Sequence, residues 1–232
     1  MKAFERIYVA LDTTNVDYAV DLAGKLKGLV GGMKVGKEFF TANGPQGVAK
    51  ITDVGMPVFL DLKFHDIPNT VAGAIRASGK TGAEIVNVHA QGGPEMLRQA
   101  AKAGKEAGIP LTIAVTVLTA LDQDDLTAIG VKDTIEDQVV RLAKLTQDCG
   151  LQGVVCSAKE IAPIRKACGP DFKLIVPGIR PAWAASGDQK RIMTPADAVK
   201  EGADILVIGR PITKADDPVV AAQKIADELE GL

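Results

Sequence analysis

Residues 58–70 read VFLDLKFHDIPNT, a short apolar strand that runs through a group of charges into the start of a helix. Side chains two positions apart on a strand share one face, so Asp61 and Lys63 are expected to point the same way. Leu60 and Leu62 then face a covering helix. Charges at the end of a buried strand are costly unless they are paired. The Asp-x-Lys pair therefore indicates a site at the end of this strand.

The same residues allow a purely structural interpretation. Pro68 suits the first turn of a helix, so Asp66 could serve only as its N-cap. Asp61 and Lys63 could form an ion pair that only closes the mouth of a barrel. This stretch alone leaves both interpretations open.

The rest of the chain repeats the strand-and-helix pattern. Strands are expected at residues 7–11, 32–36, 57–63, 85–89, 111–116, 153–156, 173–176 and 206–208. Helices are expected at residues 15–27, 38–54 (interrupted near Gly44-Pro45), 68–81, 94–107, 135–149, 158–167 and 218–229, with a short acidic turn at 121–126. Such alternation predicts a parallel sheet covered by helices. Eight units in 232 residues favour an α/β fold with a single (β/α)8 TIM-barrel domain over residues 1–232.

Composition excludes several classes of protein. The net charge of −2 offers no basic excess for nucleic acid or an anionic membrane surface. No apolar run approaches the roughly 20 residues of a membrane span, and the N-terminal residues contain no signal-peptide core. Cys149, Cys156 and Cys168 lack metal-ligand spacing and are typical of reduced thiols in a cytoplasmic protein. With two histidines in the chain, no metal site is expected.

Polar side chains follow the expected strands. In (β/α)8 barrels the active site lies at the carboxyl ends of the strands. The residues at or just beyond those ends include Asp12, Lys34, Asp61, Lys63, His89, Thr116, Thr119, Arg180 and Arg210. Such a concentration at one end of the barrel predicts an active site there.

The segments after the last two strands favour a phosphate site. Gly178 with Arg180, and Gly209 with Arg210, lie where this fold commonly binds phosphate. Glycine lets a ligand approach backbone N–H groups, a helix N-terminus adds positive partial charge, and arginine matches phosphate oxygens. Turn-forming glycines with surface arginines are the alternative.

The segment of residues 180–193 is too long for a simple connection between two elements, and it contains few apolar side chains that could be buried. We expect a lid over the phosphate in which Gln189 donates a further hydrogen bond. An insertion without a role is the alternative interpretation.

The charged residues of the barrel have a chemical rationale as a group. Lys34, Asp61, Lys63 and Asp66 could form an alternating chain of charges, with Asp12 beside it. Each carboxylate keeps a neighbouring ammonium protonated, and each ammonium keeps a carboxylate ionised. A fixed ammonium can protonate a carbanion, and a fixed carboxylate can repel a departing anionic group. This chemistry suits decarboxylation without a metal or bound cofactor.

Six segments together resemble the orotidine 5′-monophosphate decarboxylase family, in its bacterial branch, over essentially the whole chain. They are residues 9–12 (VALD), 34–36 (KVG), 61–71 (DLKFHDIPNTV), 116–119 (TVLT), 177–180 (PGIR) and 208–212 (IGRPI), in family order. The resemblance implies conversion of orotidine 5′-monophosphate to uridine 5′-monophosphate (UMP) and CO2, the last step of UMP synthesis, with no cofactor.

The resemblance also implies roles for individual residues. Lys63 would protonate C6 of the pyrimidine, and Asp61 would stand against the substrate carboxylate. Lys34 and Asp12 would hold the charge network and the ribose hydroxyls. Further substrate contacts would come from Thr119, Arg180, Gln189, Gly209 and Arg210, with Arg210 the main phosphate clamp.

The resemblance further implies a homodimer. Asp66 and Thr70 would reach across its two-fold interface into the neighbouring subunit's site. Asp66 would then be more than an N-cap, and a monomer would have an incomplete site. His65 and His89 are interpreted as structural, hydrogen-bonded histidines.

Two alternative functions remain from the sequence. A related barrel enzyme, 3-keto-L-gulonate 6-phosphate decarboxylase, shares the Asp-x-Lys-x-x-Asp pattern but uses magnesium, so EDTA would discriminate between the two. The full 63–70 run and the long segment with Gln189 argue against it. A catalytically silent nucleotide-binding protein would be expected to lose Lys63, which is present here.

Overall fold

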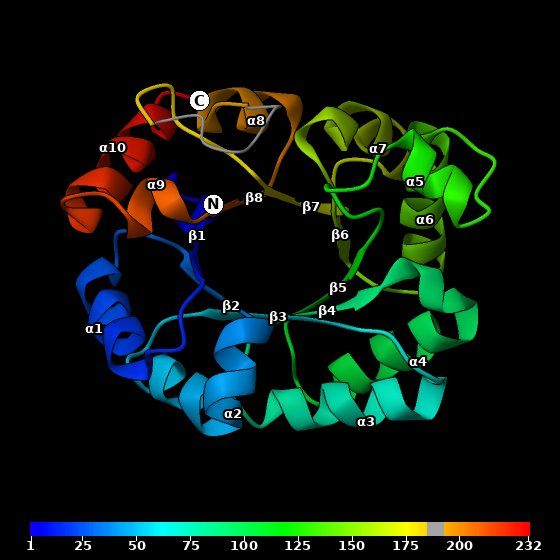
Figure 1. Ribbon diagram of the computed structural model, residues 1–232, viewed down its shortest axis with the longest axis horizontal. Coiled ribbons are helices and arrows are strands. Elements are labelled where there is room, and N and C mark those ends of the chain that lie inside the picture. Colours follow the sequence, from blue (N-terminus) through cyan, green and yellow to red (C-terminus); the bar gives the residue numbers. More distant parts are fainter. Residues whose placement is uncertain (185–192) are drawn as a thin grey trace.

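Eight parallel strands close into a barrel in chain order (Figure 1). The computed structural model describes residues 1–184 and 193–232. The strands are β1 (Ile7–Leu11), β2 (Gly32–Gly36), β3 (Val58–Phe64), β4 (Ile85–His89), β5 (Leu111–Val115), β6 (Gly153–Val155), β7 (Lys173–Pro177) and β8 (Ile205–Ile208). Every expected strand is present within a residue or two of its expected bounds. The prediction of a (β/α)8 barrel is confirmed.

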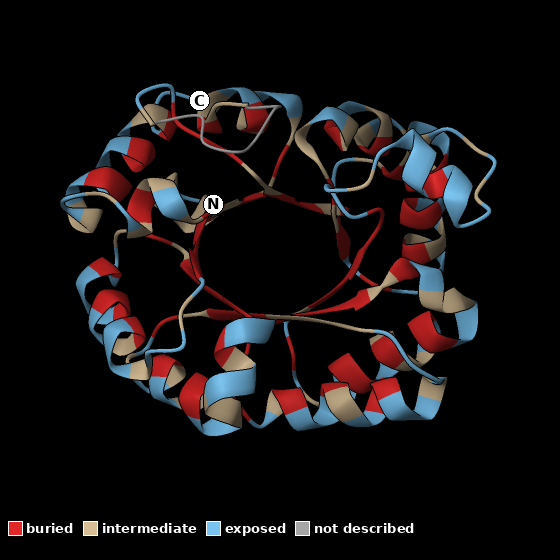
Figure 2. Cartoon of the chain, viewed as in Figure 1, coloured by how far each residue is buried: buried red, intermediate tan, exposed pale blue. Residues whose placement is uncertain are grey.

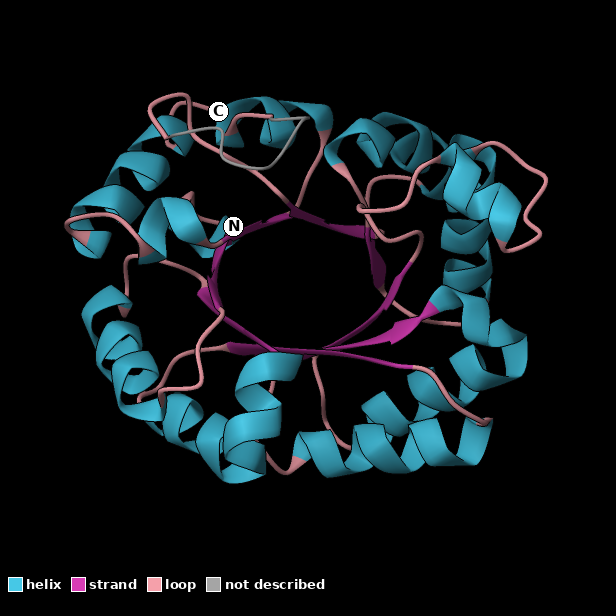
Figure 3. Ribbon diagram, in the orientation of Figure 1, coloured by secondary structure: helices cyan, strands magenta, loops and turns pink. Residues whose placement is uncertain are grey.

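Helices form a ring around the barrel (Figure 3). They are α1 (Val16–Leu26), α2 (Lys37–Asp53), α3 (Pro68–Gly79), α4 (Gly93–Glu106), α5 (Gln123–Ala128), α6 (Ile135–Asp148), α7 (Ile161–Cys168), α8 (Pro195–Glu201), α9 (Arg210–Thr213) and α10 (Pro218–Leu229). Short 3-10 turns occupy Phe4–Arg6, Ala90–Gly92 and Ala158–Glu160. Across the described ranges, none of these helices has both the length and the apolar character of a membrane span.

The helix α2 bends where the sequence predicted an interruption. Gly44 has a φ of 61°, outside the helical region, and Pro45 follows it. A positive φ is easily adopted by glycine, and proline supplies no N–H for the preceding turn. The helix α2 therefore consists of two helical segments with a kink between them at Gly44.

Besides the four-residue helix α9, which was not expected, two helices correct the sequence-based expectation. Most of the acidic turn expected at 121–126 belongs instead to the helix α5, whose N-cap Asp122 accepts hydrogen bonds from the N–H groups of Asp124 and Asp125. The helix α8 was not expected at all. Its N-cap Thr194 accepts a hydrogen bond from the N–H of Asp197, and Pro195 occupies its first turn. In both cases a cap starts a helix too short to show a clear apolar period.

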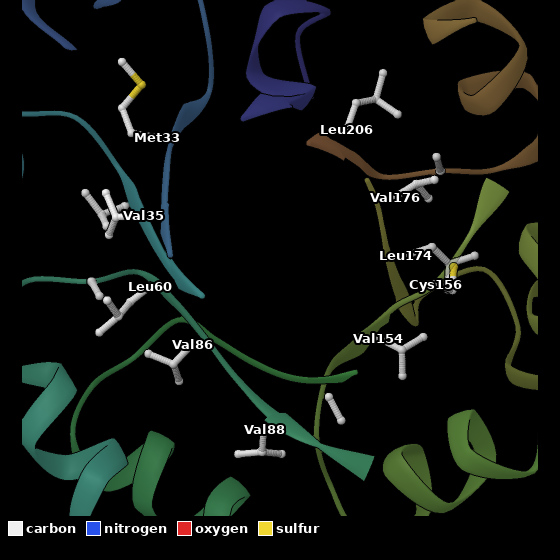
Figure 4. Packing of buried hydrophobic residues seen from close by; sticks show 14 of the residues in the cluster. Met33, Val35, Leu60, Val86, Val88, Val154, Cys156, Leu174, Val176 and Leu206 are labelled. Carbon is white, nitrogen blue, oxygen red and sulfur yellow. The ribbon is translucent and has the colours of Figure 1, made fainter. Parts of the chain in front are cut away.

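The apolar core has two layers. The larger layer lies between the strands and the helices, and its labelled members in Figure 4 are distributed around the ring of strands. The smaller layer consists of residues that alternate along the strands with the first set and fill the barrel interior. Its members are Tyr8, Phe59, Ile85, Ile113, Ile175 and Ile205. Figure 2 shows the matching pattern, with buried strands and helices that are buried on one face.

Candidate active site

The interior face of the barrel changes from apolar to polar toward the carboxyl ends of the strands. Phe59 and Ile85 belong to the interior layer. Two residues further along the same strands, on the same face, are Asp61 and Asn87. The interior side chains of the barrel are therefore apolar toward the amino ends of the strands and polar or charged toward their carboxyl ends.

Four charged residues meet at this polar end. The ammonium Nζ of Lys63 lies 2.6 Å from Oδ1 of Asp61. The ammonium of Lys34 lies 3.8 Å from Oδ2 of Asp61 and 3.2 Å from Oδ1 of Asp12. Lys34 and Asp61 have side chains only 11% and 14% exposed, whereas that of Asp12 is 68% exposed. Of the predicted chain of charges Lys34, Asp61, Lys63 and Asp66, with Asp12 beside it, the part from Asp12 to Lys63 is present.

The absence of a side chain at Gly36 leaves space for the ammonium group of Lys34. A Cβ atom at this position would lie 3.2 Å from Nζ of Lys34. The strand register places Gly36 beside Asp61 and places Lys34 beside Ala10 of β1. A glycine at this point therefore lets a lysine side chain occupy the space between two strands.

The environment of Asp61 determines its protonation. Burial by itself acts to raise the pKa of this carboxyl, but the charges of Lys63 and Lys34 oppose it, as do hydrogen bonds from Lys63 and Asn87. These groups together hold the pKa of Asp61 below its ordinary value. Asp61 is therefore an anion at neutral pH.

The backbone at Lys63 departs from a regular strand. Its φ is 53°, and it is the only residue other than glycine with a positive φ in the described ranges. The register of β3 against β4 shifts between Leu60 and Phe64. The sequence correctly predicted that Asp61 and Lys63 would meet, but a regular pleat is the wrong reason. A left-handed turn at Lys63 accompanies the contact.

Asn87 is the site residue that the sequence analysis missed. It is fully buried on β4. Its Nδ2 donates to Oδ1 of Asp61 at 2.7 Å, and its Oδ1 accepts from the backbone N–H of Lys63 at 2.8 Å. The signal was available, because Asn87 is a lone amide in an apolar strand and shares the interior face with Ile85.

Asp66 and Thr70 lie apart from the charged cluster within this chain. Both side chains are exposed, and Oδ1 of Asp66 accepts a hydrogen bond from the N–H of Ile67 at 2.7 Å. Among the described residues, no ion pair links Asp66 to Lys63. The structural alternative is wrong for Asp66, because the N-cap of α3 is Ile67 and has no side-chain cap.

The two histidines lie next to each other near the cluster. The ring centroids of His65 and His89 are 5.6 Å apart. Burial, followed by the positive charges of His65, Lys37 and Lys63, lowers the pKa of His89 to about 4. His89 is therefore neutral at neutral pH, which agrees with a structural role.

The expected phosphate residues follow β7 and β8. Gly178 has a φ of 78°, which turns the chain sharply after β7. Arg180 is buried, and its N–H donates to the carbonyl of Met193 at 3.1 Å, which joins the two ends of the expected lid. Gly209 is the N-cap of α9, which begins at the exposed Arg210. Gln189 and most of the expected lid lie outside the described residues.

A cavity of about 600 Å³ opens at the ends of β5, β6 and β7. Thr119, Ser157 and Gly178 are among its lining residues. Ser157 was not singled out from the sequence, although it directly follows the expected sixth strand. The cavity is large enough for a small organic ligand and adjoins one of the two phosphate segments.

Nowhere in residues 1–184 and 193–232 do three His, Cys, Asp or Glu side chains form a group that could hold a metal ion.

Known proteins match this chain along nearly its entire length. Residues 5–225 match the family described as "Orotidine 5'-phosphate decarboxylase / HUMPS family". The orotidine 5′-phosphate decarboxylase of Paramagnetospirillum magneticum is 54% identical over 229 residues, covering 96% of this chain and 97% of that protein. Its namesake from Trichlorobacter lovleyi is 52% identical over 232 residues, covering 98% of this chain and 96% of that protein.

A solved structure agrees with the sequence relatives. The crystal structure of orotidine 5′-phosphate decarboxylase from Lactobacillus acidophilus has a TM-score of 0.86 and 37% identity, covering 96% of this chain and 98% of that one. Sequence and fold therefore lead to the same group of proteins. With the family match spanning residues 5–225, the chain belongs to the orotidine 5′-phosphate decarboxylase / HUMPS family.

Proposed function

We propose that this protein decarboxylates orotidine 5′-monophosphate to UMP and CO2, the final step of UMP synthesis. Its family and its relatives carry the name of this carboxy-lyase. The observation that carries the proposal is the Lys63 ammonium, 2.6 Å from the Asp61 carboxylate at the polar end of the barrel. An ammonium fixed in this way can deliver a proton to a carbon atom in front of it.

The proton from Lys63 solves the main chemical difficulty of this reaction. When the bond from C6 to the carboxylate breaks, CO2 leaves and its electron pair remains on C6 of the pyrimidine. Lys63 donates a proton from Nζ to C6, and solvent then restores the proton to the amine. Proton transfer from a positioned acid contributes about 10²–10⁴-fold to a rate.

Asp61 has two functions in this mechanism. It orients the Lys63 ammonium, and its negative charge lies against the substrate carboxylate until that group departs as neutral CO2. The low pKa of Asp61 keeps this charge in place at neutral pH. Lys34 and Asp12 continue the network, which suits them to hold the ribose hydroxyls. Since the charges are fixed before the substrate binds, little reorganisation is needed during the reaction.

The remaining substrate contacts are assigned to the other side of the barrel. Thr119 lines the cavity, and we assign it to the pyrimidine ring. Arg180, Gly209 and Arg210 follow β7 and β8 and are assigned to the pyrimidine or the phosphate, with Arg210 as the main phosphate clamp. Gln189 is assigned to the same end of the substrate.

The exposed segment after β3 is proposed to form part of a homodimer. Asp66 and Thr70 are exposed in the single chain, and the apolar Ile67 between them is 67% exposed. A partner subunit would cover Ile67 and receive Asp66 and Thr70 in its own site. Each site would then combine residues of two chains.

We also place the enzyme in the cytoplasm. Its three cysteines, Cys149, Cys156 and Cys168, are free and buried, as suits a reducing compartment. Its proposed partners are small nucleotides, not nucleic acid or a membrane.

The ultraviolet absorbance of orotidine 5′-monophosphate, measured with the purified protein in excess EDTA, tests the proposed reaction. A change to the spectrum of UMP is expected. Binding of the nucleotide without a spectral change would instead indicate a silent binder. If there is neither binding nor change, sugar phosphates with magnesium restored would be the next substrates, because the family description also includes HUMPS.

A further inference from the structure

We propose that Asn87 is a positioning residue that orients Asp61 and holds Lys63 in its left-handed conformation. This inference rests on the proposed decarboxylation and adds a residue from a fourth strand to the machinery. Asn87 contacts Asp61 and Lys63 at once, with Nδ2 at 2.7 Å from Oδ1 of Asp61 and Oδ1 at 2.8 Å from the backbone N of Lys63.

Asn87 supports the backbone of Lys63. A left-handed φ is unfavourable for a residue with a side chain, so Lys63 needs external support. The register shift between Leu60 and Phe64 interrupts the regular pairing of β3 with β4 at this point. The Asn87 side chain accepts the hydrogen bond of the Lys63 N–H there. The turn that directs the ammonium toward Asp61 is therefore held by an amide of the neighbouring strand.

Asn87 also orients the Asp61 carboxylate. Oδ1 of Asp61 receives both the Lys63 ammonium, at 2.6 Å, and the Asn87 amide, at 2.7 Å. These two donors fix the plane of the carboxylate, which leaves Oδ2 on the side of Lys34, at 3.8 Å. The amide cannot be reversed, because its Nδ2 would then face the Lys63 N–H and its Oδ1 would face an anion.

An amide at position 87 meets both requirements, whereas a carboxylate would not. Aspartate at position 87 would keep the acceptor for the Lys63 N–H but would place a second carboxylate against Asp61. Two adjacent carboxylates share a proton, and the pair takes up protons at higher pH. The other titratable groups around Asp61 are Lys63 on its own strand, Lys34 on β2, Asp12 after β1, and His89 of β4. None of these titratable residues is substituted in the Asn87→Asp variant.

The experiment compares the pH dependence of decarboxylation in Asn87→Asp, Asn87→Ser and wild type, below the melting temperature of each. We expect kcat to fall about 100-fold, as for misplacement of a reacting group by about 1 Å. The KM is expected to stay within about three-fold, since Asn87 contacts none of the assigned phosphate residues. For Asn87→Asp, the acid limb of the profile should move up by at least about one pH unit.

The control is Val88→Ala on the same strand. Val88 is fully buried in the outer core layer, so its truncation lowers the melting temperature without touching the site. Its kcat and acid limb should match wild type. An unshifted acid limb in Asn87→Asp, or the same kinetic changes in Val88→Ala, would overturn the proposal. Failure of both Asn87 variants to fold would make Asn87 a structural residue and would also overturn it.

The wild-type protein is assayed in parallel, and its activity distinguishes failure of the proposed decarboxylation from failure of the role assigned to Asn87. An inactive wild-type protein would refute the proposed decarboxylation itself. An active wild-type protein with unaltered Asn87 variants would refute only the assignment of Asn87.

Discussion

Lys63 combines the central charge of the site with an unfavourable backbone conformation. A left-handed φ costs roughly 1–2 kcal/mol in a residue with a Cβ atom. The observed φ of 53° is accompanied by a hydrogen bond from the Lys63 N–H to Asn87 and by the ion pair with Asp61. Strain of this kind persists where the surroundings compensate for it and is concentrated at functional sites. The position of the Lys63 ammonium and the left-handed backbone of Lys63 therefore depend on the same two neighbours, Asn87 and Asp61.

Replacement of the lysine tests its chemical role separately from its conformation. In Lys63→Ala the Cβ atom and its backbone strain remain, while the ammonium is lost. We expect nucleotide binding to persist and turnover to fall by at least about three orders of magnitude. Calorimetric titration with UMP and the absorbance assay measure the two properties. Lys102→Ala, which removes an exposed lysine on α4, serves as the control. Near-normal turnover in Lys63→Ala would remove Lys63 from its assigned role.

The lowered pKa of His89 predicts that the stability of the folded protein depends on pH. Burial, with the charges of His65, Lys37 and Lys63, lowers its pKa to about 4 in the folded protein, from the ordinary 6.5. Between these values the unfolded chain binds a proton that the folded protein does not. The stabilisation due to neutral His89 is thus complete above pH 6.5 and is lost as the pH falls toward 4.

The variant His89→Gln cannot be protonated and should lose this dependence. Urea unfolding of wild type and variant at several pH values between 6.5 and 4 measures the effect. The free energy of unfolding should fall less steeply with decreasing pH in the variant. Equal slopes in the two proteins would show that His89 does not titrate differently on unfolding.

At the scale of elements, the two ends of the barrel have different tasks. The carboxyl ends of the strands carry the charged cluster. At the opposite end, Arg165 of α7 donates to the carbonyls of Gly169, Pro170, Phe172 and Gly202, and to Oδ2 of Asp204 at 2.8 Å. These contacts join α7 to the starts of β7 and β8. This placement agrees with the general division of (β/α)8 barrels into a catalytic face and a stabilising face.

Truncation of Arg165 should therefore affect stability more than activity. Arg165→Ala removes the donor of several partly buried carbonyls and one of the donors to the Asp204 carboxylate, which keeps those from Lys173 and from the N–H of Leu174. We expect the free energy of unfolding to fall by about 2–4 kcal/mol, with kcat unchanged at temperatures below the transition. Urea unfolding and the absorbance assay give the two values.

The matched control is Arg76→Ala, which removes an ion pair with Glu106 in which both side chains are about half exposed. An exposed pair contributes about 0–1 kcal/mol, so this variant should remain close to wild type. Similar losses of stability in the two arginine variants would contradict the role assigned to the Arg165 contacts.

At the scale of the whole molecule, we propose that the site is built from two chains. Asp66 is exposed and makes no ion pair with the cluster of its own chain, in the part that the structure describes. A partner that brings Asp66 to the neighbouring Lys63 would complete the alternation of charges. Activity should then depend on association of the subunits.

Mixing of two inactive variants tests this arrangement. In a hybrid dimer of Lys63→Ala and Asp66→Ala, one site contains both substitutions and the other contains neither. After random exchange at equal concentrations, we expect about a quarter of wild-type activity to return. Activity after denaturation and joint refolding measures this recovery, and each variant refolded alone is the control. No recovery would mean that Asp66 acts within its own subunit.

Much of the fold could be predicted because periodicity is a local property of the chain. The strands recur with apolar residues on both faces, and the long helices carry an apolar face of period 3.6, so their existence and order are readable. Besides the four-residue α9, the helices α5 and α8 escaped prediction because six and seven residues are too few to establish such a period. Their starts depend on the caps Asp122 and Thr194, which single residues provide.

The sequence by itself determined the barrel, the end at which the site lies, and the identity of its charged residues, because strand ends converge once the order of elements is known. Only the tertiary structure decided how those charges meet. The left-handed turn at Lys63 depends on a register shift between β3 and β4, and Asn87 acts from a strand more than twenty residues away. Such contacts arise from packing between segments that are far apart in the sequence, and local sequence patterns contain no information about them.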